Sequence, residues 1–346
     1  MTDIRDLLVD SLDRVMTKCV TTDLLASAET GRFPDDAWAA IEGLQLHEAL
    51  PRVSGDLDMG WSGFQAVAEA AGRHALPLPL IEHLLARWFC LAAGAECPEG
   101  LLTVIPDASA LAIAGDTVGG TAGMVPWGGR ADHAVAVIGD DEHAMLAVLP
   151  LRHARVEPMR NMAGEPRARV SFDGVEPLLL VSLDAGLGAG RLHQLGAACR
   201  AAQTTGAIEA ILLLTREHAA TRHQFGRPLA AFQAIQNHMV AIAGELAAMA
   251  AATTVAFRVM DAGTDIFLPV AVAKARADVA AERVAMSSHQ VHGAIGVSAE
   301  YRLQFLTRRL WAWRSEFGTG QSWREEIGRL VLARGNGALR DLVARG

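Results

Sequence analysis

RHQFGRPLAAFQAIQ at residues 222–236 and QVHGAIG at residues 290–296 are the two stretches from which the fold of this sequence is read. Each lies at the end of a long run of helical periodicity and interrupts it with glycine. Gly226 and Pro228 separate one helical pattern from the next, which begins with FQAIQ. Gly293 ends the helical pattern that follows. Both stretches therefore mark the ends of long helices.

The rest of the chain divides into three kinds of pattern around these stretches. Long helical runs with Ala-rich seams and short breaks predict an antiparallel helical bundle over residues 183–346. Residues 1–97 also have helical periodicity and predict an N-terminal helical domain. Residues 98–182 alternate in short runs, with a hairpin turn GDD at 139–141, and predict a small antiparallel β domain. We therefore expect a mainly α fold with a small middle β domain.

The two stretches resemble segments of the acyl-CoA dehydrogenases, a family of flavoproteins. The first is similar to the family's R-x-Q-F-G-x-P-[IL]-x-x-F-Q-x-x-Q, with the spacing from Arg222 to Gln233 intact. The second is similar to Q-x-x-G-G-x-G, with Ala294 in place of the second glycine. The order helical domain, β domain, helical bundle is also the architecture of this family. The chain is identified as a short, divergent member that resembles subunits of two-component acyl-CoA dehydrogenases.

The resemblance implies FAD as cofactor and a set of residues that contact it. GTGQ at 318–321 stands where the family has G-T-S-Q and adds two members to that set. The implied FAD contacts are Arg222, Phe225, Gln233, Gln290, Gly293, Ala294, Thr319 and Gln321. An Arg fork suits a phosphate oxygen, an amide suits ribose or adenine, and glycine allows close backbone approach. The alternative is that these are solvated residues at helix ends.

The family also brings two segments of one subunit to the flavin site of its neighbour. The resemblance therefore implies a homo-oligomer or a homologous partner subunit. The β domain has no T-E-x-x-x-G-S-D segment, with which typical members cover the flavin. Short members of this kind form one half of two-component dehydrogenases, including those that act on steroid side chains.

The catalytic base is the point at which this sequence departs from the family. The reaction removes a proton α to a thioester while the β hydrogen leaves as hydride to the flavin. Most members place a Glu directly before the G-T-x-Q segment, where this chain has Phe317, and Glu316 is shifted by one residue. Such a shift rotates a helical side chain by about 100°. The family's second position for the base corresponds to Gly196, so Glu316 is the candidate catalytic base.

Arg200 is the candidate substrate-binding residue. The resemblance implies an Arg in many members at the position of Ala197, and Arg200 lies one turn further along the same predicted helix. The alternative is an exposed helix Arg. Ser322 and Glu325 have the spacing of a capping box and predict the start of the last helix.

Composition limits the remaining possibilities. The formal charge of −8 at pH 7 argues against nucleic acid as a partner. The four cysteines have no metal-ligand spacing, and no metal is expected. The N-terminus does not resemble a signal peptide, and no apolar run reaches the roughly 18 residues of a membrane span. We expect a cytoplasmic protein without membrane contact.

Three functions follow from these observations. The first is FAD-dependent α,β-dehydrogenation of an acyl-CoA, with Glu316 as base and an electron-transferring flavoprotein as acceptor. The second is a non-catalytic partner subunit that supplies one side of a flavin site to a homologous chain. The third is a helical scaffold that has lost the cofactor.

Overall fold

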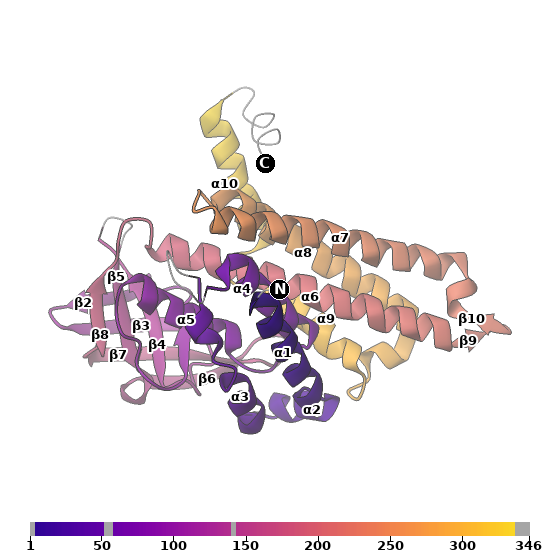
Figure 1. Cartoon of the computed structure of the whole chain (residues 1–346), viewed down its shortest axis with the longest axis horizontal. Coiled ribbons are helices and arrows are strands. Elements are labelled where there is room, and N and C mark those ends of the chain that lie inside the picture. The colour runs from indigo at the N-terminus through magenta and orange to yellow at the C-terminus, as the bar shows by residue number, and fades with distance from the viewer. Residues whose placement is uncertain (1–3, 52–57, 140–142, 336–346) are drawn as a thin grey trace.

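The computed structural model of the chain describes residues 4–51, 58–139 and 143–335. Helices come first along the chain, strands follow, and long helices complete it (Figure 1). This order confirms the expected fold class, mainly α with a small β domain. Residues 93–101 and 183–188 connect these three parts, and the division into domains at 97/98 and 182/183 stays a prediction.

Short and medium helices form the first part. They are α1 (Ile4–Cys19), α2 (Thr22–Glu29), α3 (Asp35–Glu42), the 3-10 helix η1 (Leu46–Ala49), α4 (Gly60–Arg73) and α5 (Leu80–Ala92). The hydroxyl of Thr21 caps α2 by accepting a hydrogen bond from the backbone N–H of Leu24, at 3.2 Å. Asp35 and Asp36 follow Pro34 and occupy the first turn of α3, where acidic side chains favour the helix dipole.

Two four-stranded sheets form the middle part. The first has the order β1 (Leu102–Val104), β4 (His133–Ile138), β5 (Met145–Pro150) and β8 (Leu179–Ser182). The second has the order β2 (Leu111–Ala114), β3 (Thr117–Pro126), β7 (Pro166–Val175) and β6 (Arg155–Arg160), and the 3-10 helix η2 (Leu151–His153) follows β5. The pairs are antiparallel, as expected, except that β1 and β4 are parallel. The long connection through β2 and β3 allows this, because parallel neighbours need a crossover.

The strand β4 is buried on both faces. Val135 and Val137 pack against the helices, whereas Ala134 and Ala136 pack against the second sheet. Successive side chains of a strand point to opposite faces, so the larger residues of HAVAVI turn to one layer and the small ones to the other. β4 pairs with β5 as an antiparallel neighbour, as the expected hairpin requires. Part of its turn, at 139–141, lies outside the described residues.

Long helices form the last part. They are α6 (Ala189–Thr221), α7 (Gln233–Asp261), α8 (Phe267–His292), α9 (Arg302–Trp313) and α10 (Gly320–Arg334). Shorter elements between them are β9 (His223–Gln224), β10 (Arg227–Pro228), η3 (Leu229–Ala231) and η4 (Gly293–Val297). α4 and α6 approach so closely that glycine is needed in both: a Cβ at Gly206 would lie 1.9 Å from the Glu69 carbonyl oxygen, and a Cβ at Gly72 1.9 Å from that of Gln203.

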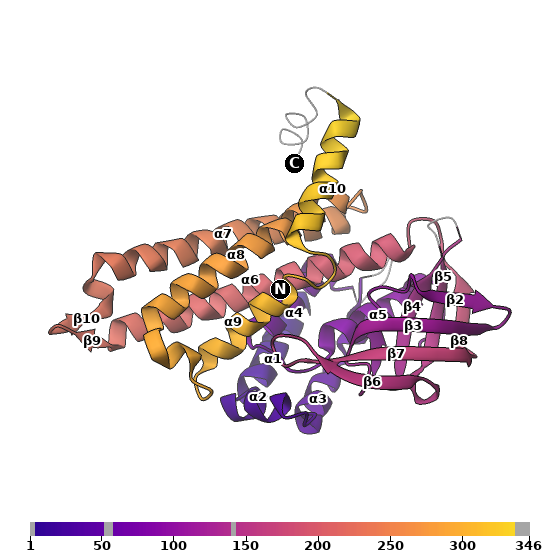
Figure 2. The same ribbon diagram turned by 180° about the vertical axis from the view of Figure 1, so that it is seen from behind.

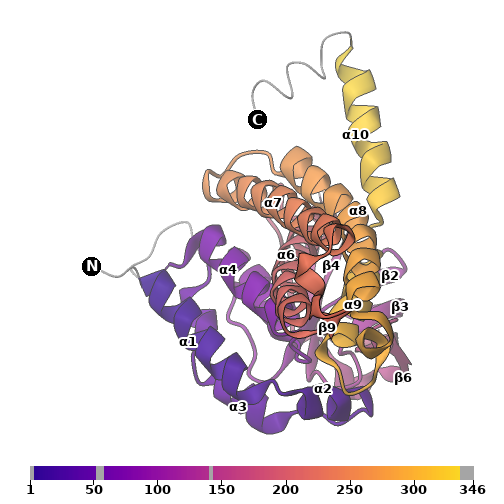
Figure 3. The same cartoon turned by 90° about the vertical axis from the view of Figure 1, so that its right-hand side faces the viewer.

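The helix α10 leaves the bundle and projects from the body of the molecule (Figures 1 and 3). Its N-cap is Thr319, whose Oγ1 accepts a hydrogen bond from the backbone N–H of Ser322 at 3.1 Å. The expectation that Ser322 caps this helix is therefore wrong by one turn. Thr319 offers a capping oxygen earlier in the chain, and Gly318, with a φ of 87°, allows the turn directly before it.

The helix α7 carries an apolar surface that the rest of the described chain covers only in part. Its most apolar segment has a mean hydropathy of 1.7, and 33% of that segment is buried. By length and composition α7 could cross a membrane, although Ala, Gly and Thr interrupt its larger apolar residues, so that the sequence shows no continuous apolar run there. A single helix of this kind is weak evidence for a membrane span. Its exposed stripe consists of Val240, Gly244, Ala247, Ala251 and Val255.

Candidate functional site

The residues of the first stretch surround the β9–β10 hairpin at one end of the bundle (Figure 1). Arg222 follows α6, Phe225 lies in the hairpin turn and Gln233 begins α7. Phe225 is 93% exposed, and its φ of 52° turns the chain back. The exposed side chains of Arg222 and Gln233 make no hydrogen bond or ion pair with any residue that the structure describes. The hairpin therefore presents free donors and an uncovered aromatic ring.

The second stretch lies at the same end of the bundle. The rings of His218 in α6 and His292 in α8 stack with centroids 4.5 Å apart, which holds the ends of these helices together. Gln290, Gly293 and Ala294 are exposed there. Gly293 has a φ of 64°, and a Cβ at this position would meet nothing within 4 Å. We call the surface that presents Arg222, Phe225, Gln233, Gln290, Gly293 and Ala294 the hairpin edge.

Thr319 and Gln321 lie at the start of α10. Figure 2 shows that α10 is separate from the β9–β10 hairpin. Gly320 packs against Asp278, in the middle of α8. At 1.5 Å per residue, about 18 Å of helix separate that contact from Gln290. Within one chain, the expected flavin contacts therefore form two separate groups.

Phe317 occupies the position at which the resemblance expects the base. Its ring lies directly on Gly196 of α6, where a Cβ would be 2.2 Å from the Phe317 ring. The two positions that the resemblance allows for a base are thus neighbours in this fold, although they are far apart in sequence. Neither position carries a carboxylate, and the buried ring of Phe317 fills the space next to Gly196.

Glu316, the expected base, is engaged by basic side chains. Its Oε1 accepts hydrogen bonds from Arg167 at 2.5 Å and from Asn161 at 3.0 Å, and its Oε2 accepts one from Arg200 at 2.8 Å. Burial alone would raise the pKa of Glu316, but Arg167 and Arg200 outweigh burial and lower this pKa to about 2. A general base must compete for the substrate's proton, so a carboxylate held by two guanidinium groups is poorly suited to that role.

Arg200, the expected substrate-binding residue, belongs to the same set of charges. Only 4% of its side chain is exposed, so it is not an exposed helix Arg either. Its three guanidinium nitrogens donate to Glu82 at 2.5 Å, to Gln203 at 2.5 Å and to Glu316 at 2.8 Å. Burial would lower the pKa of Arg200, but Glu82 and Glu316 raise it. The protein itself therefore uses the donors that a substrate would need.

One charge cluster joins the three parts of the chain, and it consists of Glu82, Glu165, Glu316, Arg167, Arg200 and Arg309. Glu82 belongs to α5, Arg167 to β7, Arg200 to α6 and Arg309 to α9. Glu165 links Arg167 to Arg309, each at 3.2 Å. Buried charges are tolerated only when they are paired, so the cluster favours one mutual placement of the three parts.

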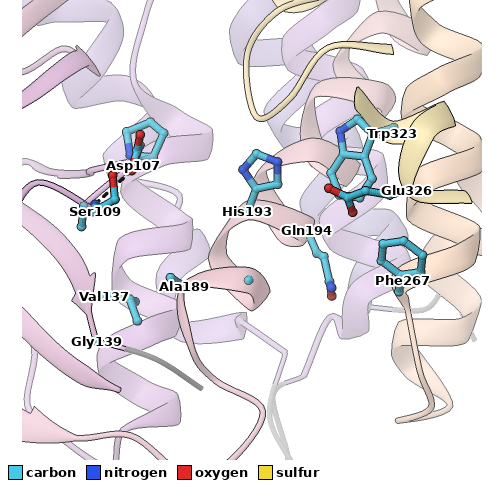
Figure 4. Close-up of a pocket in the computed structure, with 13 residues that line it drawn as sticks. Asp107, Ser109, Val137, Gly139, Ala189, His193, Gln194, Phe267, Trp323 and Glu326 are labelled. Carbon is cyan, nitrogen blue, oxygen red and sulfur yellow. Dashed lines mark hydrogen bonds between the residues drawn. The ribbon is translucent and has the colours of Figure 1, made fainter. Parts of the chain in front are cut away.

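A cavity of about 490 Å³ opens beside this region, between the carboxyl ends of β1 and β4 and the first turns of α6, α8 and α10. Figure 4 shows His193 near its centre, with Asp107 on the strand side and Glu326 on the α10 side. His193 stacks on Trp323, with ring centroids 5.3 Å apart, and burial lowers its pKa. The described lining contains these two carboxylates and no Lys or Arg.

This cavity cannot be identified from the sequence. The available signal is IPDAS at 105–109, a turn-rich segment after the first strand of the middle part. Loops at the carboxyl ends of parallel strands often form binding sites. That signal depends on the parallel pairing of β1 with β4, which periodicity does not reveal.

Comparison with known proteins gives consistent matches. Residues 190–332 match the family described as acyl-CoA dehydrogenase, C-terminal domain. Acyl-CoA dehydrogenase IpdE2 of Mycobacterium tuberculosis is 28% identical over 243 residues, which cover 70% of this chain and 69% of that protein. Probable acyl-CoA dehydrogenase YngJ of Bacillus subtilis is 34% identical over 134 residues, which cover 39% of this chain and 34% of that protein.

Solved structures share the fold over nearly the whole chain. A Tcur3481-Tcur3483 steroid ACAD variant has a TM-score of 0.85 at 22% identity, covering 95% of this chain and 98% of that one. The ChsE4-ChsE5 complex from Mycobacterium tuberculosis has a TM-score of 0.81 at 23% identity, covering 97% and 98%. Butyryl-CoA dehydrogenase from Megasphaera elsdenii has a TM-score of 0.82 at 18% identity, covering 96% and 99%.

Proposed function

The chain belongs to the acyl-CoA dehydrogenase family, and we propose that it is one subunit of an FAD-dependent enzyme that oxidises an acyl-CoA thioester to its α,β-unsaturated form. In this proposal a homologous partner chain supplies the catalytic base. The observation that carries the proposal is the contact of Phe317 with Gly196. Both family positions for the base meet at this contact, and a Phe ring stands where a carboxylate would have to act.

Glu316 then has a structural role in place of the expected catalytic one. It neutralises Arg167 and Arg200, which are both almost fully buried. The same pairing removes Arg200 from the substrate. The sequence expectations for Glu316 and Arg200 are therefore revised on the physical ground that their polar atoms already have partners.

The hairpin edge fits a dinucleotide cofactor. Arg222 offers a diphosphate a guanidinium that has no partner among the described residues, Gln233 and Gln290 offer amides, and Gly293 leaves open space for close approach. FAD, when bound, supplies the acceptor for the hydride that leaves the β carbon. In the proposal, the hairpin edge of this chain holds the cofactor, and Thr319 and Gln321 form a second group of contacts at the start of α10.

We infer assembly with another chain from the separation of these two groups by about 18 Å of helix. In the proposal, a flavin that touches one chain's hairpin edge meets the GTGQ-type segment of a second chain. The stripe of small residues on α7 suits close packing of a partner helix, because Ala and Gly let two backbones approach. We therefore assign this stripe to the interface between chains and not to a membrane.

The acyl-CoA itself binds in the partner chain in this proposal. CoA carries several phosphate charges, whereas the cavity next to Phe317 is lined by Asp107 and Glu326 without a described Lys or Arg. Like charges would raise the free energy of CoA binding there. A fatty acyl or steroid side-chain thioester, an electron-transferring flavoprotein as acceptor, a cytoplasmic location and no nucleic acid partner complete the proposal.

FAD titration of the purified assembly tests the proposal. Arg222→Gln removes one charge-assisted contact, which is worth about 1.5–3 kcal/mol and corresponds to roughly 10–100-fold weaker FAD binding. Arg216→Gln, an exposed Arg on the same helix, is the matched control and should leave FAD binding unchanged. Native mass spectrometry of the same sample identifies the chains that bind together.

Two results would contradict the proposal. Equal FAD affinity in wild type and Arg222→Gln would remove the hairpin edge from the cofactor site. A wild-type assembly that takes up no FAD would favour the helical scaffold that has lost the cofactor.

A further inference from the structure

Lys274 is a buried lysine on α8 whose ammonium group caps another helix. It is 0% exposed, and its Nζ donates to the carbonyl oxygens of Trp313 at 2.8 Å and Arg314 at 2.9 Å. These carbonyls end α9, and no further turn of that helix follows to donate N–H groups to them. Burial lowers the pKa of Lys274 to about 7, with Arg200 acting in the same direction and Glu316 opposing it. Burying an amine costs free energy, and the two hydrogen bonds that Lys274 donates hold the last turn of α9 in place.

Asp278 lies one turn further along the same face of α8 and holds the other end of the connection. Its Oδ1 accepts a hydrogen bond from Arg314 Nε at 2.6 Å, and its Oδ2 pairs with Arg324 of α10 at 3.2 Å. Gly320, the first residue of α10, packs so tightly that a Cβ there would be 2.3 Å from the Asp278 Cβ. Lys274 and Asp278 thus fix the end of α9 and the beginning of α10 on one helix.

The segment between these two anchors has an uncommon backbone. Phe317 and Gly318 both have positive φ, 52° and 87°, and the carbonyl of Phe317 accepts a hydrogen bond from the indole N–H of Trp323 at 3.0 Å. A non-glycine residue in this region costs free energy and persists only where its surroundings hold it. The anchors on α8 provide such surroundings.

We propose that Lys274 and Asp278 are positioning residues that set the course of residues 314–319 and the direction of α10. They place Thr319 and Gln321 for the shared flavin site, and this consequence rests on the proposed function. They also aim α10, which projects beyond the body of the chain (Figure 3). One pair of side chains on α8 therefore controls both the second group of flavin contacts and the orientation of the projecting helix.

Hydrogen–deuterium exchange of the purified protein tests the positioning itself, without FAD. Lys274→Met removes the donor, and Asp278→Asn removes the charge that pairs with both arginines. Both variants should speed amide exchange over residues 314–325 by about tenfold while α4 and α6 keep their protection. Gly320→Ala would place a Cβ 2.3 Å from the Asp278 Cβ and should therefore have the same direction of effect. Arg283→Gln, which breaks a different ion pair of α8, is the matched control.

FAD binding by the assembly separates positioning from simple stabilisation. Lys274→Met should weaken FAD binding and alter the visible flavin spectrum, and Lys274→Gln, which keeps a donor, should restore both in part. Unchanged exchange over residues 314–325 would overturn the proposal. Faster exchange with unchanged FAD affinity and spectrum would reduce Lys274 and Asp278 to structural residues. If the wild type takes up no FAD, the proposed function fails, and the exchange data still decide whether the two residues set the segment.

Discussion

The substitution Glu316→Gln tests the assignment of Glu316 to the charge cluster. Glu316 accepts hydrogen bonds from Arg167, Arg200 and Asn161, and 15% of its side chain is exposed. The amide keeps the size of the side chain but carries no charge, and its nitrogen cannot accept a hydrogen bond. Two buried guanidinium groups would then share the remaining carboxylates, Glu82 and Glu165.

The expected loss of stability is large because the side chains of Arg167 and Arg200 are buried away from water. Breaking a buried ion pair by removing one partner destabilises a protein by about 3–5 kcal/mol. The same carboxylate at an exposed site would contribute about 1 kcal/mol or less. Glu325 is exposed and lies near Arg329 on α10, so Glu325→Gln is the matched control. The free energy of unfolding from chemical denaturation should fall by several kcal/mol in Glu316→Gln and by less than about 1 kcal/mol in the control.

Activity measured on the same samples completes the test. Below its unfolding transition, the Glu316→Gln assembly should still be bleached by acyl-CoA at a rate within about tenfold of wild type, since loss of a general base costs 10²–10⁴-fold. Unchanged stability together with loss of bleaching would make Glu316 the base and refute the assignment to the cluster.

Other consequences concern the base position, acid stability and the surface of α7. Gly196→Ala should destabilise the chain by about 1–3 kcal/mol, since its Cβ collides with Phe317, and Phe317→Leu should relieve part of this loss in a double-mutant cycle. The pKa of Glu316 is lowered from 4.5 to about 2, so its contribution to stability is present above pH 4.5 and lost as the pH falls towards 2. Unfolding followed by circular dichroism over this pH range should show a loss of stability that is smaller in Glu316→Gln than in the wild type. Ala247→Arg should reduce the assembled mass in sedimentation, and Ala220→Arg, on the exposed side of α6, should not.

The fold was largely accessible from the sequence because its signals are local. Helical periodicity, alternation and glycine breaks report neighbouring residues, and they give the order of helices and strands that the structure has. The parallel pairing of β1 with β4 was not accessible, because it depends on how a long connection returns. The sequence predicts the cap of α10 at Ser322, whereas the structure has it at Thr319, because two capping side chains lie one turn apart.

In the candidate site, the sequence could predict only those properties of a residue that do not depend on distant parts of the chain. The exposure of Arg222, Phe225 and Gln290 follows from their positions at helix ends. The environment of Glu316 does not, because Arg167 and Arg200 come from β7 and α6 and meet it only in the folded chain. The one-residue shift in sequence thus places an acid near the expected position, where its pairing with Arg167 and Arg200 favours a structural role.

The chain that carries the base can be identified directly by anaerobic mixing of acyl-CoA with this protein purified as the sole polypeptide and supplied with FAD. Butyryl-CoA, octanoyl-CoA and a steroid side-chain CoA are suitable probes, and the visible flavin absorbance is the readout. If a partner chain supplies the base, the absorbance persists with each probe and is bleached only when a homologous chain with a carboxylate at the base position is present. Bleaching by the single polypeptide would contradict this assignment of the base.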